Sequence, residues 1–256
     1  MNTELKKGIC DVLEYFKAMG FERVPVKFER FVSTTAQPPV MDTMAFPPPV
    51  SRVQALSKIE ALQALREEIG DCTRCSLSRE RTNIVFGEGN PDARIMFIGE
   101  APGREEDIQA RPFVGDAGQL LTKLIGKMGE KMGFKREDVY IANIVKCRPP
   151  MNRDPHEDES RTCSAFLVRQ IEIISPEVIV SLGRISTFYL SGRSGPITSF
   201  SITKERGKFF EYRVADRSIP VMPTFHPAYL MRNPKDKWLT WEDAQAVLKK
   251  LEGKAE

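Results

Sequence analysis

The sequence predicts an α/β fold built on a mainly parallel sheet. Four β-like apolar runs alternate with segments in which apolar residues recur at helical spacing. Strands that alternate with helices are typical of right-handed βαβ crossovers, which place consecutive strands parallel. The chain has 256 residues, of which 41% are hydrophobic, and this fits one large domain or one domain with an extension.

The N-terminal part of the chain, residues 1–50, is predicted to be an accessory arm. Apolar residues from Thr3 to Met19 fall on one face of a helix, and the stretch from Thr34 to Val50 is rich in proline, which favours an extended linker. The arm is interpreted either as a docking segment for a protein partner or as a tail, and both interpretations stay open. The domain itself is expected to span residues 51–256.

The domain is expected to begin with a helix from Arg52 to Ile69. The four β-like runs that follow are Arg94–Gly99, Val139–Val145, Glu177–Leu182 and Ile219–Phe225. Helical patterns occupy Gln119–Lys131, Glu157–Ile174, Ile185–Leu190 and Leu239–Leu251. The segment Ser199–Val214 is interpreted as a small hairpin insertion.

The stretch from Ile95 to Leu121 predicts a ligand site. Its buried strand ends in a Gly-Glu-Ala-Pro-Gly loop, where two glycines let the backbone approach a ligand and the proline fixes one dihedral angle. An acidic cluster, an Arg-Pro-Phe-Val-Gly turn and a helical pattern follow. Open α/β sheets bind ligands at such rigid loops between a strand and a helix N-terminus. An ordinary strand-to-helix connection is the alternative.

Charge and hydropathy limit the class of protein. The formal net charge of +3 is too small to indicate nucleic-acid binding unless basic residues gather in a local patch. No apolar stretch is long enough to cross a bilayer, and the N-terminus lacks the apolar core and cleavage site of a signal peptide. We therefore expect a cytoplasmic protein without membrane contact, in which thiols stay reduced.

Four cysteines have the spacing of a metal site. Cys72 and Cys75 form a C-x-x-C pair, Cys147 follows the second β-like run, and Cys163 lies in the first turns of the next helix. Both zinc and an iron–sulfur cluster are consistent with four cysteines, although a structural zinc site usually has two close pairs. The spacing of the four cysteines alone modestly favours a cubane iron–sulfur cluster over zinc. Cys10 stands apart and is interpreted as a small hydrophobic residue.

Several multi-residue motifs occur together around these cysteines. In chain order they are GEAPGREED, RPFVGDAGQLL, YIANIVKCRPPMNRDP and FHPAYLMRNP. In this order and with these cysteines, the chain resembles the family-4 uracil-DNA glycosylases, the iron–sulfur enzymes of the uracil-DNA glycosylase superfamily. The resemblance covers residues 65–251. It implies a three-layer α/β/α sandwich around a four-stranded parallel sheet, and a structural [4Fe-4S] cluster on Cys72, Cys75, Cys147 and Cys163.

A glycosylase needs a ring that stacks on the flipped base, a reader of the base edge and a donor to the leaving uracil. By resemblance, Phe113 stacks on uracil and Asn143 reads its edge, accepting from N3–H and donating to O4, a pattern that rejects cytosine. His226 is expected to donate to uracil O2, on which negative charge develops. The backbone at Gly99, Glu100 and Ala101 is expected to line the uracil pocket.

Activation of the attacking water is the open part of this prediction. Family-1 relatives carry an aspartate in the first loop, where this sequence has Ala101. We expect Glu106 or Asp107 to take over part of that work. The alternative is that Glu105, Glu106 and Asp107 only cap and charge the start of a helix or turn.

Basic and apolar residues in two loops are candidates for DNA contact. Phosphate contacts are expected from Arg148, Arg153, Arg161 and Lys146 near the cysteines and from Arg232. By resemblance, an apolar tip formed by Tyr229, Leu230 and Met231 enters the duplex and fills the vacated space. The expected partner is uracil-containing DNA, single- or double-stranded, and the protein is expected to be a monomer.

The predicted activity is that of a monofunctional uracil-DNA glycosylase, which leaves an abasic site in base excision repair. No matched motif supplies the amine nucleophile that a lyase needs. One alternative is a cluster-containing DNA-binding module that has lost turnover; another is a redox protein, which would not need the uracil-reading residues. A relative that is trapped covalently on its site carries a longer basic loop with a histidine, whereas Arg104–Val114 is short and has none.

Overall fold

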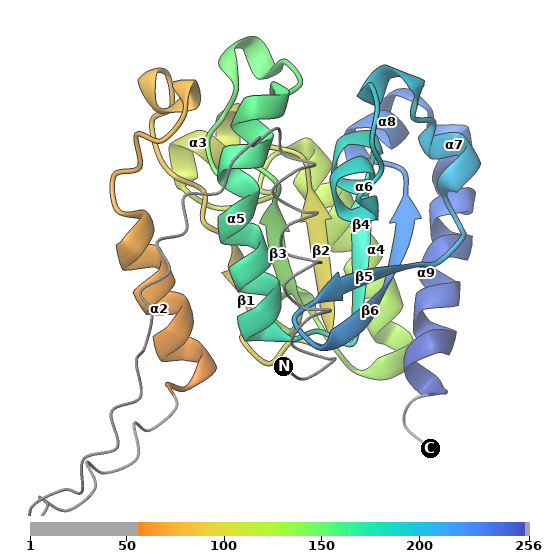
Figure 1. The fold of residues 1–256 in the computed structure, drawn as a ribbon. Coiled ribbons are helices and arrows are strands. Elements are labelled where there is room, and N and C mark those ends of the chain that lie inside the picture. The colour runs from red at the N-terminus through yellow and green to blue at the C-terminus, as the bar shows by residue number, and fades with distance from the viewer. Residues whose placement is uncertain (1–55, 254–256) are drawn as a thin grey trace, which may run out of the picture. The chain divides into compact units, whose positions relative to one another are not determined.

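A computed structural model describes residues 56–253 of the chain (Figure 1). The expected arm and its helix lie outside these residues. Helix α2 begins at Lys58 rather than at Arg52, because Ser57 has a non-helical backbone and forms a capping box with Glu60. No helix within residues 56–253 is long and apolar enough to cross a membrane.

A six-stranded sheet forms the centre of the molecule, and its order confirms the α/β prediction. The strands are arranged in the order β1-β3-β2-β4-β6-β5. The four central strands are parallel to one another and correspond to the four β-like runs, namely β2 (Ile95–Gly99), β3 (Tyr140–Asn143), β4 (Val178–Leu182) and β6 (Arg217–Thr224). Two antiparallel strands extend the sheet at its edges, β1 (Glu88–Gly89) and β5 (Phe210–Val214).

The predicted hairpin insertion over Ser199–Val214 is wrong in detail. This segment forms a short 3₁₀ turn (Ile197–Ser199), helix α7 (Ile202–Glu205) and strand β5. The hairpin is made by β5 together with the first half of β6, and Val214 pairs with Arg217 across its turn. The second half of β6 pairs with β4, so one strand serves both the hairpin and the parallel sheet.

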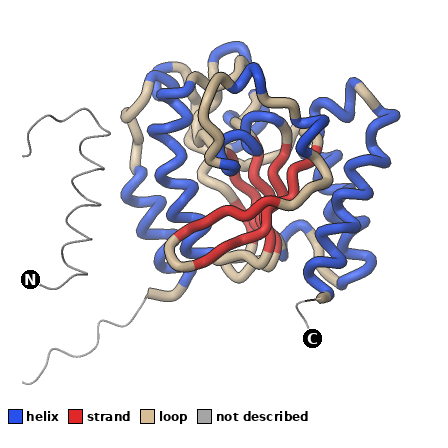
Figure 2. The backbone as a smooth tube through the Cα atoms, turned by 45° about the vertical axis from the view of Figure 1, so that its right-hand side comes forward, coloured by secondary structure: helices blue, strands red, loops and turns tan. Residues whose placement is uncertain are grey.

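Helices cover both faces of the sheet (Figures 1 and 2). The core on one face is built with α2 (Lys58–Ile69), α5 (Glu157–Ile174) and α6 (Arg184–Ser191), and the core on the other with α4 (Asp116–Met132) and α9 (Lys237–Glu252). Strand β2 is buried on both faces: Met96 and Ile98 join the first core, and Ile95 and Phe97 the second.

The loops at the carboxyl ends of the parallel strands carry two short helices. Helix α3 (Arg104–Gln109) follows β2 and the Gly-Pro loop, and helix α8 (Pro227–Arg232) follows β6. Three further 3₁₀ turns lie at Ser76–Arg79, Arg136–Asp138 and Pro150–Asn152, and a fourth, Pro234–Asp236, precedes α9. Because parallel strands end at the same edge, the loops after β2, β3 and β6 meet there.

Candidate active site and cysteine cluster

A cavity of about 480 Å³ opens at the carboxyl edge of the sheet. It is lined by residues from the loops after β2, β3 and β6 and from the turn before α4. Six of the seven predicted catalytic and uracil-binding residues line it together, namely Glu100, Ala101, Glu106, Phe113, Asn143 and His226. Gly99 lies beside it, since a Cβ there would come within 2.4 Å of Asn143 Oδ1 and 2.5 Å of Phe113 Cζ. A side chain at Gly99 would therefore displace Asn143 or Phe113, so this position requires glycine.

Asn143 is the last residue of β3, and its side chain is buried with an unused acceptor. Only 1% of the residue is exposed, and Oδ1 has no hydrogen-bond partner among the described residues. An unpaired amide oxygen in a buried position is unfavourable unless a ligand pairs with it. The backbone carbonyl of Asn143 is held by Lys146 Nζ at 3.0 Å, which fixes the end of the strand.

Phe113 holds a left-handed backbone conformation, with φ of 52°, in the turn before α4. Its ring is 6% exposed, and the centroid lies 5.7 Å from that of His226. The backbone of Phe113 rests on Gly118, where a Cβ would come within 2.0 Å of the Phe113 carbonyl oxygen. The ring is therefore part of a closely fitted wall of the cavity.

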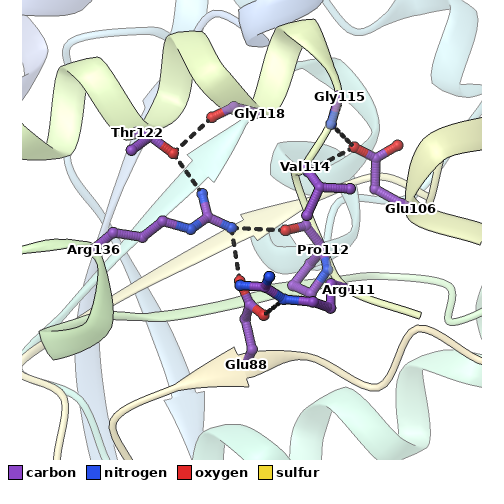
Figure 3. A network of polar contacts seen from close by, with 9 residues as sticks. All are labelled: Glu88, Glu106, Arg111, Pro112, Val114, Gly115, Gly118, Thr122 and Arg136. Atoms are coloured by element: carbon purple, nitrogen blue, oxygen red, sulfur yellow. Dashed lines mark hydrogen bonds and ion pairs between the residues drawn. The ribbon is translucent and has the colours of Figure 1, made fainter. Parts of the chain in front are cut away.

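Glu106 joins the two loops that enclose the cavity, and Figure 3 shows its bonds to Val114 and Gly115. Its Oε1 accepts hydrogen bonds from the N–H groups of Val114 and Gly115, both at 2.8 Å, and its Oε2 accepts one from Gly103 at 3.1 Å. The acidic cluster lies in the first turn of α3, which starts at Arg104, so it does charge the start of a helix, as the alternative interpretation expected. Glu106 combines this role with a place on the cavity wall.

Asp107, the other candidate for activating water, faces away from the cavity. It is 2% exposed and accepts hydrogen bonds from the N–H groups of Thr82, at 2.9 and 3.0 Å, and Asn83, at 3.1 Å. These bonds tie α3 to the segment before β1. Asp107 therefore stabilises the scaffold below the loop and does not reach a ligand in the cavity.

His226 precedes α8 as its N-cap residue. Nδ1 accepts a hydrogen bond from the N–H of Ala228 at 3.2 Å, so the proton of the neutral ring is on Nε2. Burial and the charge of Arg232 lower the pKa of His226 to about 4, against a smaller opposing effect of Glu106. The imidazole is thus neutral near pH 7 and offers an N–H donor.

Glu100 and Asn152 also line the cavity, and the sequence predicted no side-chain role for either. The Glu100 side chain lines the cavity, and burial, with a further contribution from the charge of Asp154, raises its pKa to about 7. The signal in the sequence was a carboxylate directly after Gly99, the last residue of a buried strand. Asn152 also lines the cavity, in a left-handed conformation with φ of 54°, and accepts from Arg148 Nε at 2.7 Å.

The predicted apolar tip forms part of α8, and its three residues differ in exposure. Leu230 is 3% exposed and belongs to the interior, whereas Met231 is 45% exposed. The Tyr229 ring stacks on Phe225 at 4.7 Å, and its hydroxyl donates to Asp236 at 2.7 Å. Arg232 is exposed and lines the mouth of the cavity. Met151, which is 94% exposed, presents a second apolar tip that the sequence did not single out.

The basic residues near the cysteines also differ in what they contact. Arg153 makes two 2.8 Å bonds to the buried Glu159 and is 32% exposed. Its hydrogen bonds lower the pKa of Glu159 to about 2. Arg161 pairs with Glu157 on the surface of α5. The expectation that Lys146 contacts phosphate is wrong, because it is 1% exposed and donates to Asn143 O and Gln170 Oε1.

The four cysteines of the predicted metal site meet around one small enclosed space. Cys72 and Cys75 are half-buried, Cys147 and Cys163 are buried, and all four are free thiols. Among the sulfurs that accept hydrogen bonds are Cys72, from Arg74 Nη1 at 3.3 Å, and Cys163, from the N–H of Lys146 at 3.2 Å. Within residues 56–253, no three His, Cys, Asp or Glu side chains are arranged to hold a single metal ion.

Comparison with known proteins agrees with this arrangement. The family model of the uracil DNA glycosylase superfamily matches residues 86–249. A type-4 uracil-DNA glycosylase of Sulfurisphaera tokodaii is 48% identical over 74% of this chain and 84% of its own length. The type-4 enzyme of Saccharolobus solfataricus is 48% identical over 77% and 89%, and that of Thermotoga maritima 49% over 68% and 85%. This chain therefore belongs to the type-4 family of the uracil-DNA glycosylase superfamily.

Proposed function

We propose that the protein is a monofunctional uracil-DNA glycosylase of base excision repair. It flips uracil out of DNA, breaks the C1′–N1 bond and adds water to C1′, so that free uracil and an abasic site remain. The observation that carries this proposal is the buried Asn143 Oδ1, which has no hydrogen-bond partner within residues 56–253 and lies beside the Phe113 ring in the cavity. None of the described residues that line the cavity is a lysine, which favours hydrolysis over a lyase step.

Uracil recognition follows from the Asn143 amide and the Phe113 ring. Oδ1 would accept from uracil N3–H, while the amide N–H₂ would donate to O4. Cytosine offers an acceptor at N3 and a donor at N4, so it would meet both groups with the wrong polarity. The backbone at Gly99, Glu100 and Ala101 would form the floor of the pocket, and Phe113 would stack on the face of the base.

His226 would stabilise the leaving group. As the C1′–N1 bond breaks, the electron pair moves onto uracil and charge develops on O2. A neutral imidazole that donates from Nε2 to O2 would stabilise this charge through a hydrogen bond without first gaining a proton. The depressed pKa of His226, about 4, supports a role as a neutral donor rather than as a cation.

Glu100 is the better candidate for activating water, and Glu106 would position the loops. The Glu100 carboxyl faces the cavity with a pKa of about 7, a value suited to a general base near neutral pH. Both oxygens of Glu106 already accept backbone N–H groups. Glu106 would therefore act on the reaction by holding the Gly103 and Phe113 loops in place.

DNA would bind across the mouth of the cavity. Arg148, Arg153 and Arg232 would contact phosphates, with Arg153 also serving as the partner of Glu159. Met231 would be the wedge that enters the duplex, while Tyr229 and Leu230 would support it from within α8. The proposed substrate is uracil-containing DNA, single- or double-stranded. We also propose that the protein acts as a monomer and that residues 1–50 bind a protein partner.

We further propose that Cys72, Cys75, Cys147 and Cys163 hold a [4Fe-4S] cluster. Four free thiols around one enclosed space suit a cubane, in which four cysteines are the ligands. N–H donors to sulfur, such as those of Arg74 and Lys146, are typical of such sites. When bound, the cluster would tie the segment after α2 to α5 and to the loop after β3.

The test is product analysis with a uracil-containing oligonucleotide. The proposal expects free uracil in the supernatant and a strand that breaks at the uracil position only after alkali treatment. Binding without uracil release would favour the alternative, a DNA-binding module that has lost turnover. A strand break before alkali would contradict the monofunctional assignment.

A further inference from the structure

The position of the Phe113 ring depends on contacts from outside the cavity. A residue other than glycine keeps a left-handed backbone only when its surroundings fix it. On the C-terminal side of Phe113, the N–H groups of Val114 and Gly115 are bound by Glu106. On its N-terminal side, the carbonyl of Pro112 accepts a 2.7 Å hydrogen bond from Arg136 Nη2 (Figure 3).

Arg136 lies in the 3₁₀ turn before β3 and does not line the cavity. Its side chain is 18% exposed and reaches three segments of the chain at once. Besides Pro112 O, Nη2 donates to Glu88 Oε1 at 2.9 Å, and Nη1 donates to Thr122 Oγ1 at 2.9 Å. Thr122 in turn donates to Gly118 O at 3.0 Å, and Gly118 is the residue on which Phe113 rests.

We propose that Arg136 is a positioning residue for uracil recognition, which holds the Phe113 ring against the flipped base. It fixes the carbonyl before Phe113 and the turn of α4 beneath it through one rigid guanidinium. The inference rests on the proposed function, because it assumes that Phe113 stacks on uracil. It adds a residue that acts from behind the turn, 23 positions further along the chain than Phe113.

Arg111 offers a matched control within the same network. It also pairs with Glu88, through Nε at 2.8 Å, but it makes no contact with the Pro112 carbonyl and is 60% exposed. Replacement of either arginine removes one positive charge and one partner of Glu88. Only the Arg136 variant also loses the hydrogen bonds to the Pro112 carbonyl, directly before Phe113, and to Thr122.

The experiment compares Arg136→Met with Arg111→Met in the full chain. We expect Arg136→Met to lower kcat/KM on a uracil oligonucleotide about tenfold and to raise the inhibition constant of free uracil by a similar factor. Arg111→Met should change both by less than about twofold. Equal values for Arg136→Met and the parent, at a melting temperature that shows a folded protein, would overturn the inference.

A double-mutant cycle with Phe113→Ala shows whether Arg136 acts through the ring. We expect Arg136→Met to have less than about a twofold effect on kcat/KM once the ring is gone. A full loss in the Phe113→Ala background would mean that Arg136 acts only on general stability, and the inference would fail. If Phe113→Ala alone matched the parent, the stacking role in the proposed function would fail instead.

Arg136→Lys keeps the positive charge and should give an intermediate loss of kcat/KM. This variant replaces Arg136→Met in both experiments if Arg136→Met does not fold.

Discussion

At the residue scale, the proposed recognition of uracil uses polar groups that the protein holds at one atom while another atom stays available to the base. Asn143 is held by its backbone carbonyl, through Lys146, while its side-chain oxygen has no partner among the described residues. His226 is held through Nδ1, which leaves Nε2 to donate. Such groups do not have to reorganise when the base enters, and this favours the transition state.

Asn143→Asp should lower kcat/KM for uracil release by about 10²-fold to 10⁴-fold. The carboxylate would place an acceptor opposite uracil O4, which is itself an acceptor. Steady-state kinetics on a uracil oligonucleotide measure the loss, and a melting curve shows that the variant is folded. Parental kinetics in Asn143→Asp would exclude the edge-reading role.

The pH profile should report Glu100 and not His226. Because Glu100 must be ionised to accept a proton from water, kcat/KM should fall as pH drops below its pKa of about 7 and level off above it. The pKa of His226, about 4, gives no step between pH 5 and pH 8. Glu100→Gln should lower the rate by about 10²-fold to 10⁴-fold and remove the step near pH 7. A step that persists in this variant would assign it to another group.

At the scale of elements, close contact between α4 and the Phe113 turn shapes the cavity. Gly118 and Gly126 lie in the same helix. A Cβ built on Gly118 would meet backbone atoms of Phe113, whereas none of the described residues lies within 4 Å of a Cβ built on Gly126. The turn is also tied to α3 through Glu106. The Phe113 ring is therefore placed by two helices rather than by its loop alone.

Alanine at these two glycines should have opposite effects. Gly118→Ala should destabilise the protein by about 1–3 kcal/mol through overpacking and should reduce uracil release, because it displaces Phe113. Gly126→Ala should stabilise the helix by about 0.5–1 kcal/mol and leave activity unchanged. Thermal unfolding and the glycosylase assay measure both effects. A stable, fully active Gly118→Ala protein would contradict the close-approach argument.

At the scale of the whole molecule, the cysteine site joins segments that the sheet alone does not hold together. Cys72 and Cys75 follow α2, Cys163 lies in α5, and Cys147 follows β3, near the loop that carries Arg148 and Asn152. A cluster in this place would fix both α2 and the loop after β3. We therefore expect the cluster to contribute to stability and to the order of this loop, and not to cleavage of the C1′–N1 bond.

Removal of iron should lower the melting temperature by at least about 5 °C, given about 2–4 °C per kcal/mol for a domain of this size. It should also open the segment from α2 to Arg79 to limited proteolysis. Calorimetry and protease mapping before and after treatment with a chelator and a reductant measure these effects. Unchanged melting and cleavage after verified loss of iron would contradict a structural cluster.

The sequence predicted the parts of this molecule that depend on local pattern. Four apolar runs located the parallel strands, and motif order located the cavity. Strand β1 has only two residues, Glu88 and Gly89, and no pattern could reveal it. The burial of Lys146 depends on Gln170, which lies 24 residues away, so its charge suggested a surface position. The role of Arg136 depends on a backbone carbonyl, which leaves no signal in the sequence.

The most direct measurement of the central claim is a crystal structure of the protein with free uracil. We predict the ring against Phe113 in the cavity at the carboxyl edge of the sheet, with N3–H donating to Asn143 Oδ1 and O2 within hydrogen-bond distance of His226 Nε2. Uracil bound elsewhere, or bound in the cavity with no N–H facing Asn143 Oδ1, would contradict the account.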